Sequence, residues 1–395
     1  MSAFFLAGVA LGLMGGTAAD STPATCWAGD APTLTVRVDS ARREVGVTMG
    51  PFRIPARPPE AHASMHHSAA DGTPLFCFAW PVQGWARGFR LAVQNADGTP
   101  LPRAILHHLT AVNFDRRELA YPIVERLIGA GRETDDVSLP KSMGVPLTPG
   151  QRLGIYAEWH NDRGRDIEAA YIKLTMAWTP VSSRSRPTAV LPLFLDVNAE
   201  NIFGAYSIPA GRSEKSYEFT LPVGGRLLQA GGHMHDYGVG VRLEDAATGR
   251  VLARVHAKRD AAGYIQGVSR QRFILWPKRL AAGHRYRLVG EYDNPTGRPL
   301  ADAAMSHMVA VFTPDNLARW PALDPANPAL HRDMAKLAEH NRRPSRTPCP
   351  PTQGGMTHDG TMHDGKAHNG MAHDSTTRVG DRSGSAPAAA ASGCR

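Results

Sequence analysis

Short runs of alternating apolar and polar residues recur along the chain between about residues 25 and 345. Alternation with a period of two is typical of a strand that buries one face, because successive side chains point to opposite sides of a sheet. Turn sequences such as 95–98 (Asn-Ala-Asp-Gly) and 245–249 (Asp-Ala-Ala-Thr-Gly) separate the runs. This spacing predicts an all-β fold of antiparallel sandwiches. The clearest runs are residues 34–38, 89–93, 153–159, 170–178, 239–243 and 285–289.

The length of the chain predicts two domains. Its 395 residues exceed the roughly 250–300 that one hydrophobic core supports. A polar segment with prolines near both ends, residues 179–187, lies near the midpoint and is typical of a linker. We therefore expect one sandwich over 25–180 and another over 188–345, each of about eight strands. Helical patterns occur only near 123–128 and near 329–340.

The N-terminus resembles an export signal. Residues 3–14 are apolar, and the small residues at 15–19 are those that a signal peptidase accepts. We therefore expect a signal peptide over 1–19 and a secreted or periplasmic protein. No Lys or Arg precedes Phe4, so an uncleaved N-terminal anchor is the alternative. No later run has the apolar length of a membrane span, so no other stable span is expected.

The C-terminal segment, 346–395, carries a repeat of His followed by Asp or Asn every five residues, with methionines between. Residues 354–375, which carry the repeat, offer too little apolar bulk to form a core, and the composition predicts a disordered, metal-binding tail. Imidazole together with thioether suits copper. The alternative is a polar low-complexity tail that binds metals only incidentally. The repeated histidines are His358, His363, His368 and His373.

The formal charge of +8 would permit nucleic-acid binding, but the arginines are dispersed among acidic residues, as in Arg116-Arg117-Glu118. A nucleic-acid surface would require a basic stripe. We interpret the charge as a solvated surface and expect no nucleic-acid partner.

The residues that suggest chemistry are histidines at or inside predicted strands. His107 and His108 are adjacent, His160 follows the run 153–159, and His233 and His235 flank Met234. Two histidines separated by one residue share a face of a strand and can bind one ion, whereas Met234 faces the opposite side and is expected in the core. By the same alternation, His107 and His108 can share an ion only at a bulge or a strand end.

The order of these residues, followed by Met305, resembles the copper type II, ascorbate-dependent monooxygenases, the family of peptidylglycine α-hydroxylating monooxygenase and dopamine β-monooxygenase. Blocks around them are also similar, over roughly residues 50–315: 74–78 (Pro-Leu-Phe-Cys-Phe), 158–161 (Glu-Trp-His-Asn) and 290–294 (Gly-Glu-Tyr-Asp-Asn). The resemblance implies two tandem jelly-roll-like sandwiches with a copper site on each.

The resemblance also implies the ligands and the reaction. His107, His108 and His160 would hold a copper that stores electrons, and His233, His235 and Met305, with Met308 as the alternative to Met305, would hold the copper that binds dioxygen. The two copper ions, reduced by ascorbate, would hydroxylate a C–H bond of a small organic substrate. His233, His235 and Met305 would thus be the catalytic residues.

Three departures from the family limit what the resemblance implies. The core holds only Cys26 and Cys77, which could pair. Gly231 stands where the peptide hydroxylase has an Arg that grips a peptide carboxylate, so glycine-extended peptides are not expected as substrates. His307 and Val309 replace an Asn and a Tyr. His307 is expected beside the metal or on the surface, and a role as an additional copper ligand is the alternative.

Two other functions remain open from the sequence. A non-catalytic copper-binding or copper-storage protein could keep the same scaffold and capture metal with the Met/His tail. A zinc hydrolase could also contain a His-x-His pair, but no carboxylate is placed beside the pair as a general base.

Overall fold

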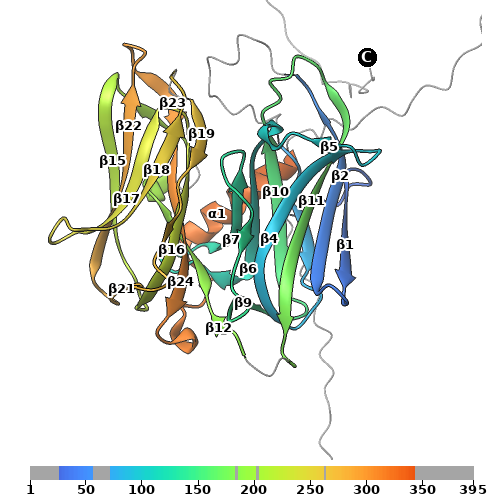
Figure 1. Cartoon of the computed structure of the whole chain (residues 1–395), viewed down its shortest axis with the longest axis horizontal. Coiled ribbons are helices and arrows are strands. Elements are labelled where there is room, and N and C mark those ends of the chain that lie inside the picture. Colours follow the sequence, from blue (N-terminus) through green and yellow to red (C-terminus); the bar gives the residue numbers. More distant parts are fainter. Residues whose placement is uncertain (1–25, 57–71, 183–185, 202–203, 262–263, 343–395) are drawn as a thin grey trace, which may run out of the picture. The chain divides into compact units, whose positions relative to one another are not determined.

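The computed structural model describes residues 26–56, 72–182, 186–201, 204–261 and 264–342. They form two β-sandwiches within one compact unit, the first from strands β1–β11 and the second from β13–β24 (Figure 1). The predicted all-β, jelly-roll-like class is confirmed. The expected signal peptide at 1–19 and the tail at 346–395, with its four repeated histidines, lie outside the described residues.

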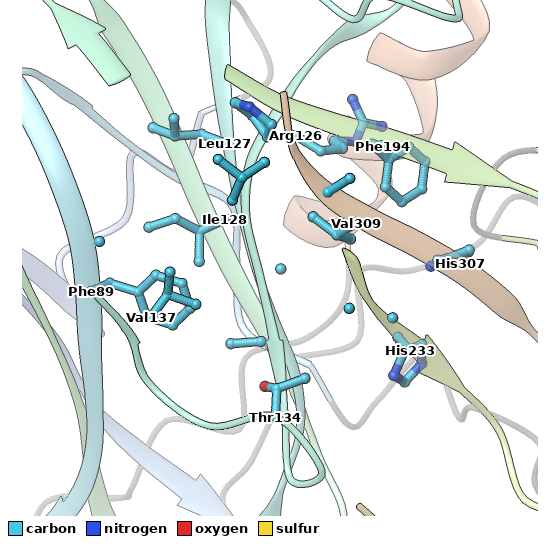
Figure 2. A pocket seen from close by; sticks show the side chains of 18 of the residues that line it. Phe89, Arg126, Leu127, Ile128, Thr134, Val137, Phe194, His233, His307 and Val309 are labelled. Carbon is cyan, nitrogen blue, oxygen red and sulfur yellow. The ribbon is translucent and has the colours of Figure 1, made fainter. Parts of the chain in front are cut away.

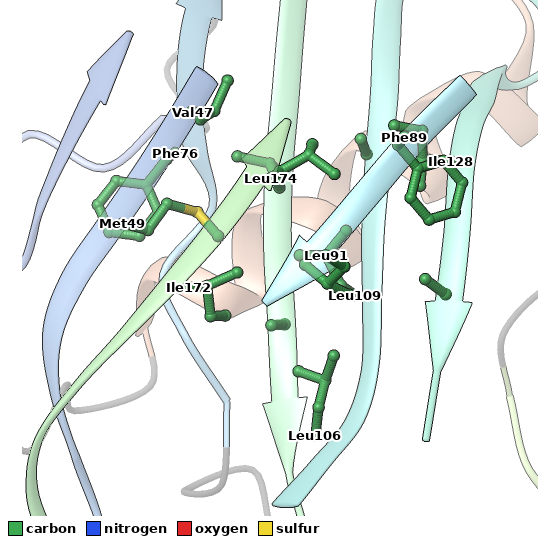
Figure 3. Close-up of a cluster of buried hydrophobic side chains, with 14 of the residues drawn as sticks. Val47, Met49, Phe76, Phe89, Leu91, Leu106, Leu109, Ile128, Ile172 and Leu174 are labelled. Atoms are coloured by element: carbon green, nitrogen blue, oxygen red, sulfur yellow. The ribbon is translucent and has the colours of Figure 1, made fainter. Parts of the chain in front are cut away.

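Two sheets enclose the first core. One has the strand order β1-β2-β11-β4-β9-β12, with β5 and β8 paired to β4, and the facing sheet has the order β3-β10-β6-β7. Ile172 and Leu174 alternate along β11 and are fully buried between the sheets, as the period of two in the run 170–178 predicts (Figure 3). The strands are β1 Thr33–Asp39, β2 Glu44–Ile54, β3 Phe76–Ala79, β4 Gly84–Asn95, β5 Pro100–Leu101, β6 Leu106–Arg117, β7 Val124–Gly131, β8 Val137–Ser138, β9 Met143–Leu147, β10 Arg152–Trp159, β11 Ile167–Pro180 and β12 Thr188–Ala189.

The second sandwich repeats this arrangement. One sheet has the order β13-β24-β16-β20, with β21 paired to β16, and the other has the order β15-β22-β17-β18-β19. Leu227, Val241 and Leu288 are fully buried between them. The strands are β13 Leu191–Asp196, β14 Tyr206–Ile208, β15 Gly211–Thr220, β16 Gly225–Met234, β17 Gly238–Asp245, β18 Val251–Arg259, β19 Ile265–Val268, β20 Gln271–Arg272, β21 Lys278–Leu280, β22 Arg285–Asn294, β23 Leu300–Ala304 and β24 Ser306–Pro314.

Residues from the second half of the chain also contribute to the first sandwich. Strand β12 pairs in parallel with β9 before the chain enters the second sandwich at β13. Helix α1 (Pro328–Arg342) confirms the helix predicted near 329–340. It packs on the first sandwich through the buried Arg126–Asp333 ion pair and through the His340 ring, which lies tilted against that of Tyr156 with centroids 3.9 Å apart. The range 188–345 therefore does not coincide with the second sandwich.

The helix predicted near 123–128 is wrong. These residues enter strand β7, which pairs antiparallel with β6. Six residues are too few to separate a helical pattern from a buried strand, and pairing with β6 decides the outcome. Strand β7 is an edge of its sheet and leads into Arg132 and Glu133.

Within the described residues, no helix has both the length and the apolar composition needed to cross a bilayer.

A disulfide joins Cys26 to Cys77 on β3, across 51 residues of sequence. The sequence left this pairing open, and the structure forms it beside the hydrogen bond from the Trp27 N–H to the Leu75 carbonyl. Closing such a loop lowers the entropy of the unfolded chain by an amount worth about 4 kcal/mol in the chain-entropy model.

We therefore expect the double variant Cys26→Ser/Cys77→Ser to lose roughly 2–4 kcal/mol of unfolding free energy, measured by urea denaturation. Wild-type protein under a reductant should then behave like the variant, which serves as the control. Equal stability of the variant and the oxidised wild type would contradict this expectation.

Candidate metal centre

A β-bulge at the start of β6 brings His107 and His108 together. Glu158 of β10 lies opposite His108, and Trp159 lies opposite Leu106, so His107 is an extra residue on β6. A bulge breaks the alternation of side chains, and the two ring centroids are 4.8 Å apart. The sequence predicted that His107 and His108 could share an ion only at a bulge or a strand end, and the bulge meets that condition.

His160 completes the group on the first sandwich. It follows the end of β10, and its N–H donates to the Ile105 carbonyl at 2.8 Å. Its ring stacks on His107 with centroids 4.2 Å apart. The three histidines that the sequence assigned to one site therefore lie together.

His233 and His235 lie where β16 ends. His233 is inside the strand, and His235 enters a tight turn in which Tyr237 has a positive φ of 66°, a conformation that costs free energy for a residue with a side chain. The His235 N–H donates to the Met305 carbonyl at 3.1 Å, which ties this turn to β24. The two rings are 5.3 Å apart.

The two histidine groups meet in a single cluster. The His107 ring centroid lies 5.2 Å from that of His235 and 5.9 Å from that of His233. Potential ligand atoms of His107, His233 and His235 all lie within 4.8 Å of one another, and so do those of His107, His108 and Glu158. The sequence expectation placed these histidines in two sites, one on each sandwich, whereas the structure gives two overlapping groups that share His107.

Contacts between the sandwiches account for this convergence. Arg132, just after β7, forms an ion pair with Asp236 of the His235 turn at 3.2 Å. Asp236 also accepts the Ile265 N–H at 2.8 Å. The end of β7 is thus held against the turn that carries His235, and this places the first histidine group beside the second.

Glu133 orients His233. The Nδ1–H of His233 donates to Glu133 Oε1 at 2.6 Å, and both side chains are largely buried. Burial by itself would raise the pKa of Glu133, but the adjacent His233 ring outweighs it and the pKa lies below its usual value. In the neutral ring, the tautomer with its proton on Nδ1 leaves Nε2 as the nitrogen that could bind a metal, and this buried nitrogen has no hydrogen-bond partner among the described residues. A carboxylate behind a metal-binding histidine commonly sets its tautomer and raises its basicity.

His307 stands next to His233 on the neighbouring strand β24. The two residues are directly opposite in the sheet, and their rings are 5.8 Å apart. His307 Nε2 pairs with the buried carboxylate of Asp196 at 3.3 Å. This position, beside a candidate ligand and tied to a carboxylate, agrees with the expected supporting role.

The three methionines of this region have different surroundings. Met234 and Met308 are buried in the second hydrophobic core, as predicted for Met234. Met305 lies between β23 and β24, is 4% exposed, and lines a pocket together with His233 and His307. Met305 therefore fits the preference over Met308 that the resemblance implied, and its role as a ligand stays a prediction.

A pocket of about 190 Å³ lies next to His233, between β7 and the β13-β24-β16 sheet. Figure 2 shows Phe194, Val309, His307 and His233 on one side, and Phe89, Ile128 and Val137 on the other. Most of the lining is aliphatic or aromatic. The arrangement is a candidate metal-binding cluster with an apolar chamber at its edge.

Sequence reasoning did not find Glu133 or Asp196, and it did not consider Glu158 as a candidate ligand. Glu133 follows a Gly-Ala-Gly-Arg segment, Asp196 ends a strand, and Glu158 was noted only as a family block. Each carboxylate is remote in sequence from the histidine that it contacts: Glu133 contacts His233, Asp196 contacts His307, and Glu158 contacts His108. Only the pairing of strands shows which carboxylate faces which ring.

No family model matches the chain, and no curated protein matches it. Solved structures that align with this chain include PNGF-II, at 9% identity and a TM-score of 0.36, over 68% of this chain and 66% of that chain. N-glycanase F (PNGase F) aligns at 10% identity and a TM-score of 0.35, over 68% of this chain and 95% of that chain. The Sulfolobus turreted icosahedral virus structure aligns at 11% identity and a TM-score of 0.33, over 70% and 96%. These likenesses assign no function to the chain.

Proposed function

We propose that this protein is a copper-dependent monooxygenase that hydroxylates a C–H bond of a small organic substrate, with dioxygen as oxidant and ascorbate as reductant. The observation that supports the proposal is the group of His107, His233 and His235, whose potential ligand atoms lie within 4.8 Å of one another. The resemblance in the order of the strand histidines and Met305 supports the same reaction.

The donor set fits copper. Imidazole binds copper in both oxidation states, and a thioether favours Cu(I). The buried Nε2 of His233 is already oriented by Glu133, and the buried Met305 lines the same pocket as His233. The residues that would hold the metal are His107, His233 and His235, with Met305 as the thioether donor.

The chain's own groups would hold this centre in place. Bound copper would supply electron transfer between ascorbate and dioxygen. Glu133 would keep the His233 tautomer that presents Nε2, and the Met305 carbonyl would hold the His235 backbone. The apolar walls beside His233 would exclude water from the substrate.

The pocket favours an enzyme over a copper-storage protein. Storage requires ligands but no apolar chamber next to them, whereas a substrate needs one. A storage protein would instead concentrate its capacity in the repeated histidines of the tail, which lie outside the described residues.

The test compares the full chain with a variant in which the four tail histidines are replaced by alanine. We expect both proteins to bind copper in the folded core, with nitrogen ligation in the electron paramagnetic resonance spectrum, and to lose the Cu(II) signal on addition of ascorbate. Copper-dependent oxygen uptake with ascorbate should persist in the tail variant and fall in Met305→Ile. Loss of most bound copper from the tail variant would instead support the storage function.

A further inference from the structure

Two cross-strand rows of residues, all of which except Asp196 line the pocket, lie on its second-sandwich side. Strand pairing aligns Phe194, Val309 and Gly231 in one row, and Asp196, His307 and His233 in the next. Residues two apart on a strand share a face, so both rows belong to one surface. The first row is apolar and contains a residue without a side chain, directly beside the row that carries the candidate ligand His233.

Missing side chains provide part of the space. A Cβ built at Gly231 would have no atom closer than 3.9 Å, and one built at Gly129, on the β7 side of the pocket, would have none within 4 Å. Neither glycine has a positive φ, so the backbone does not require glycine there. The absence of a side chain at Gly231 and at Gly129 therefore leaves space in the pocket for a ligand.

The charged side chains that line the pocket are already engaged. Arg126 pairs with Asp333, Glu133 with His233, and His307 with Asp196. His108 pairs with Glu158 at 3.4 Å. Arg270 donates to the backbone carbonyls of residues 135 and 136 and lies 3.8 Å from the exposed carboxylate of Asp135. An ionic ligand would have to leave its own charge uncompensated in this apolar space or break one of these pairs, and both are costly.

We infer that the pocket takes an uncharged, largely apolar molecule about the size of one substituted aromatic ring. A dry cavity of about 150 Å³ is sufficient for benzene, and this pocket measures about 190 Å³. Gly231 lies two residues before His233 on the same face, so such a molecule would lie next to the candidate metal centre. The claim that such a molecule is the substrate of the enzyme rests on the proposed function. The claim that the pocket binds such a molecule does not.

The test measures binding to the metal-free full chain, so that it is independent of copper. Ethylbenzene is the neutral probe, and benzoate and benzylamine are charged probes of similar size, all followed by ligand-detected NMR titration. We expect ethylbenzene to bind at least tenfold more tightly than either charged probe. Equal or tighter binding of benzoate or benzylamine would overturn the assignment.

Glycine variants locate the site. Gly231→Leu and Gly129→Leu fill the pocket from opposite walls, and each is expected to weaken ethylbenzene binding at least tenfold. Gly46→Leu on β2 is the matched control, because its Cβ would also have no atom closer than 3.9 Å and it does not line the pocket; it should bind like the wild type. Unchanged binding in both folded pocket variants would place the ligand elsewhere.

Copper titration of the same proteins separates this inference from the proposed function. If ethylbenzene binds as expected but the core takes up no copper, the copper enzyme is wrong and the pocket assignment stands. If copper binds but ethylbenzene does not, the pocket assignment is wrong and the metal centre stands.

Discussion

Replacing His233 with alanine should remove most of the copper affinity of the folded core, and replacing Glu133 with glutamine should weaken it by about 10–100-fold. His233 contributes a candidate ligand atom, the buried Nε2, so its loss should have the larger effect. Glu133 acts through His233, because its carboxylate accepts the Nδ1–H at 2.6 Å and sets the tautomer. A glutamine amide can also donate, and would allow the tautomer in which Nε2 carries the proton.

Copper affinity is measured by competition with a chelator, in a full chain whose four tail histidines are alanine so that tail binding does not mask the core. His256→Ala is the matched control, because His256 is exposed on β18 and outside the cluster. Electron paramagnetic resonance should show one nitrogen ligand fewer in His233→Ala and altered parameters in Glu133→Gln. If His233→Ala kept the wild-type affinity, His233 would not be a ligand and the proposed centre would be wrong.

Glu118→Gln should change how stability depends on pH. Glu118 is fully buried, its Oε1 accepts the Arg126 N–H at 2.6 Å, and its Oε2 has no hydrogen-bond partner among the described residues. Burial raises the pKa of Glu118 from 4.5 to about 8. Between these two values the folded protein holds a proton that the unfolded chain has released, so the unfolding free energy falls as pH rises from about 4.5 to about 8.

Glutamine takes up no proton in this pH range. The variant Glu118→Gln should therefore not lose unfolding free energy at this position as the pH rises. The unfolding free energy of the variant relative to the wild type should therefore rise by roughly 3–5 kcal/mol between pH 4.5 and pH 8.5, at about 1.4 kcal/mol for each unit of pKa shift. Urea denaturation at both pH values measures the change, and any constant cost of burying the amide cancels. Glu200→Gln, at an exposed carboxylate, is the control. A pH-independent difference between Glu118→Gln and the wild type would contradict a raised pKa.

Local patterns in the chain were sufficient for the fold class and for much of the candidate site. A period of two in the run 170–178 predicts which residues of β11 are buried, and the helix near 329–340 is long enough to be recognised. The region 123–128 was assigned incorrectly, because a short apolar run carries no reliable period and its pairing with β6 comes from residues that precede it by about ten positions. The order of the histidines along the chain identified them as one set. The sequence did not decide whether Cys26 pairs with Cys77.

The sequence could predict which side chains share a strand face, because alternation is a property of neighbouring residues. It could not predict that His107 would meet His233 and His235, that Glu133 would set the tautomer of His233, or that Gly231 would open a chamber beside it. These features depend on distances between strands that are remote in the chain, such as β7 and β16. Such distances are decided by the packing of the two sandwiches and by one bulge in β6, for which a local pattern carries no signal.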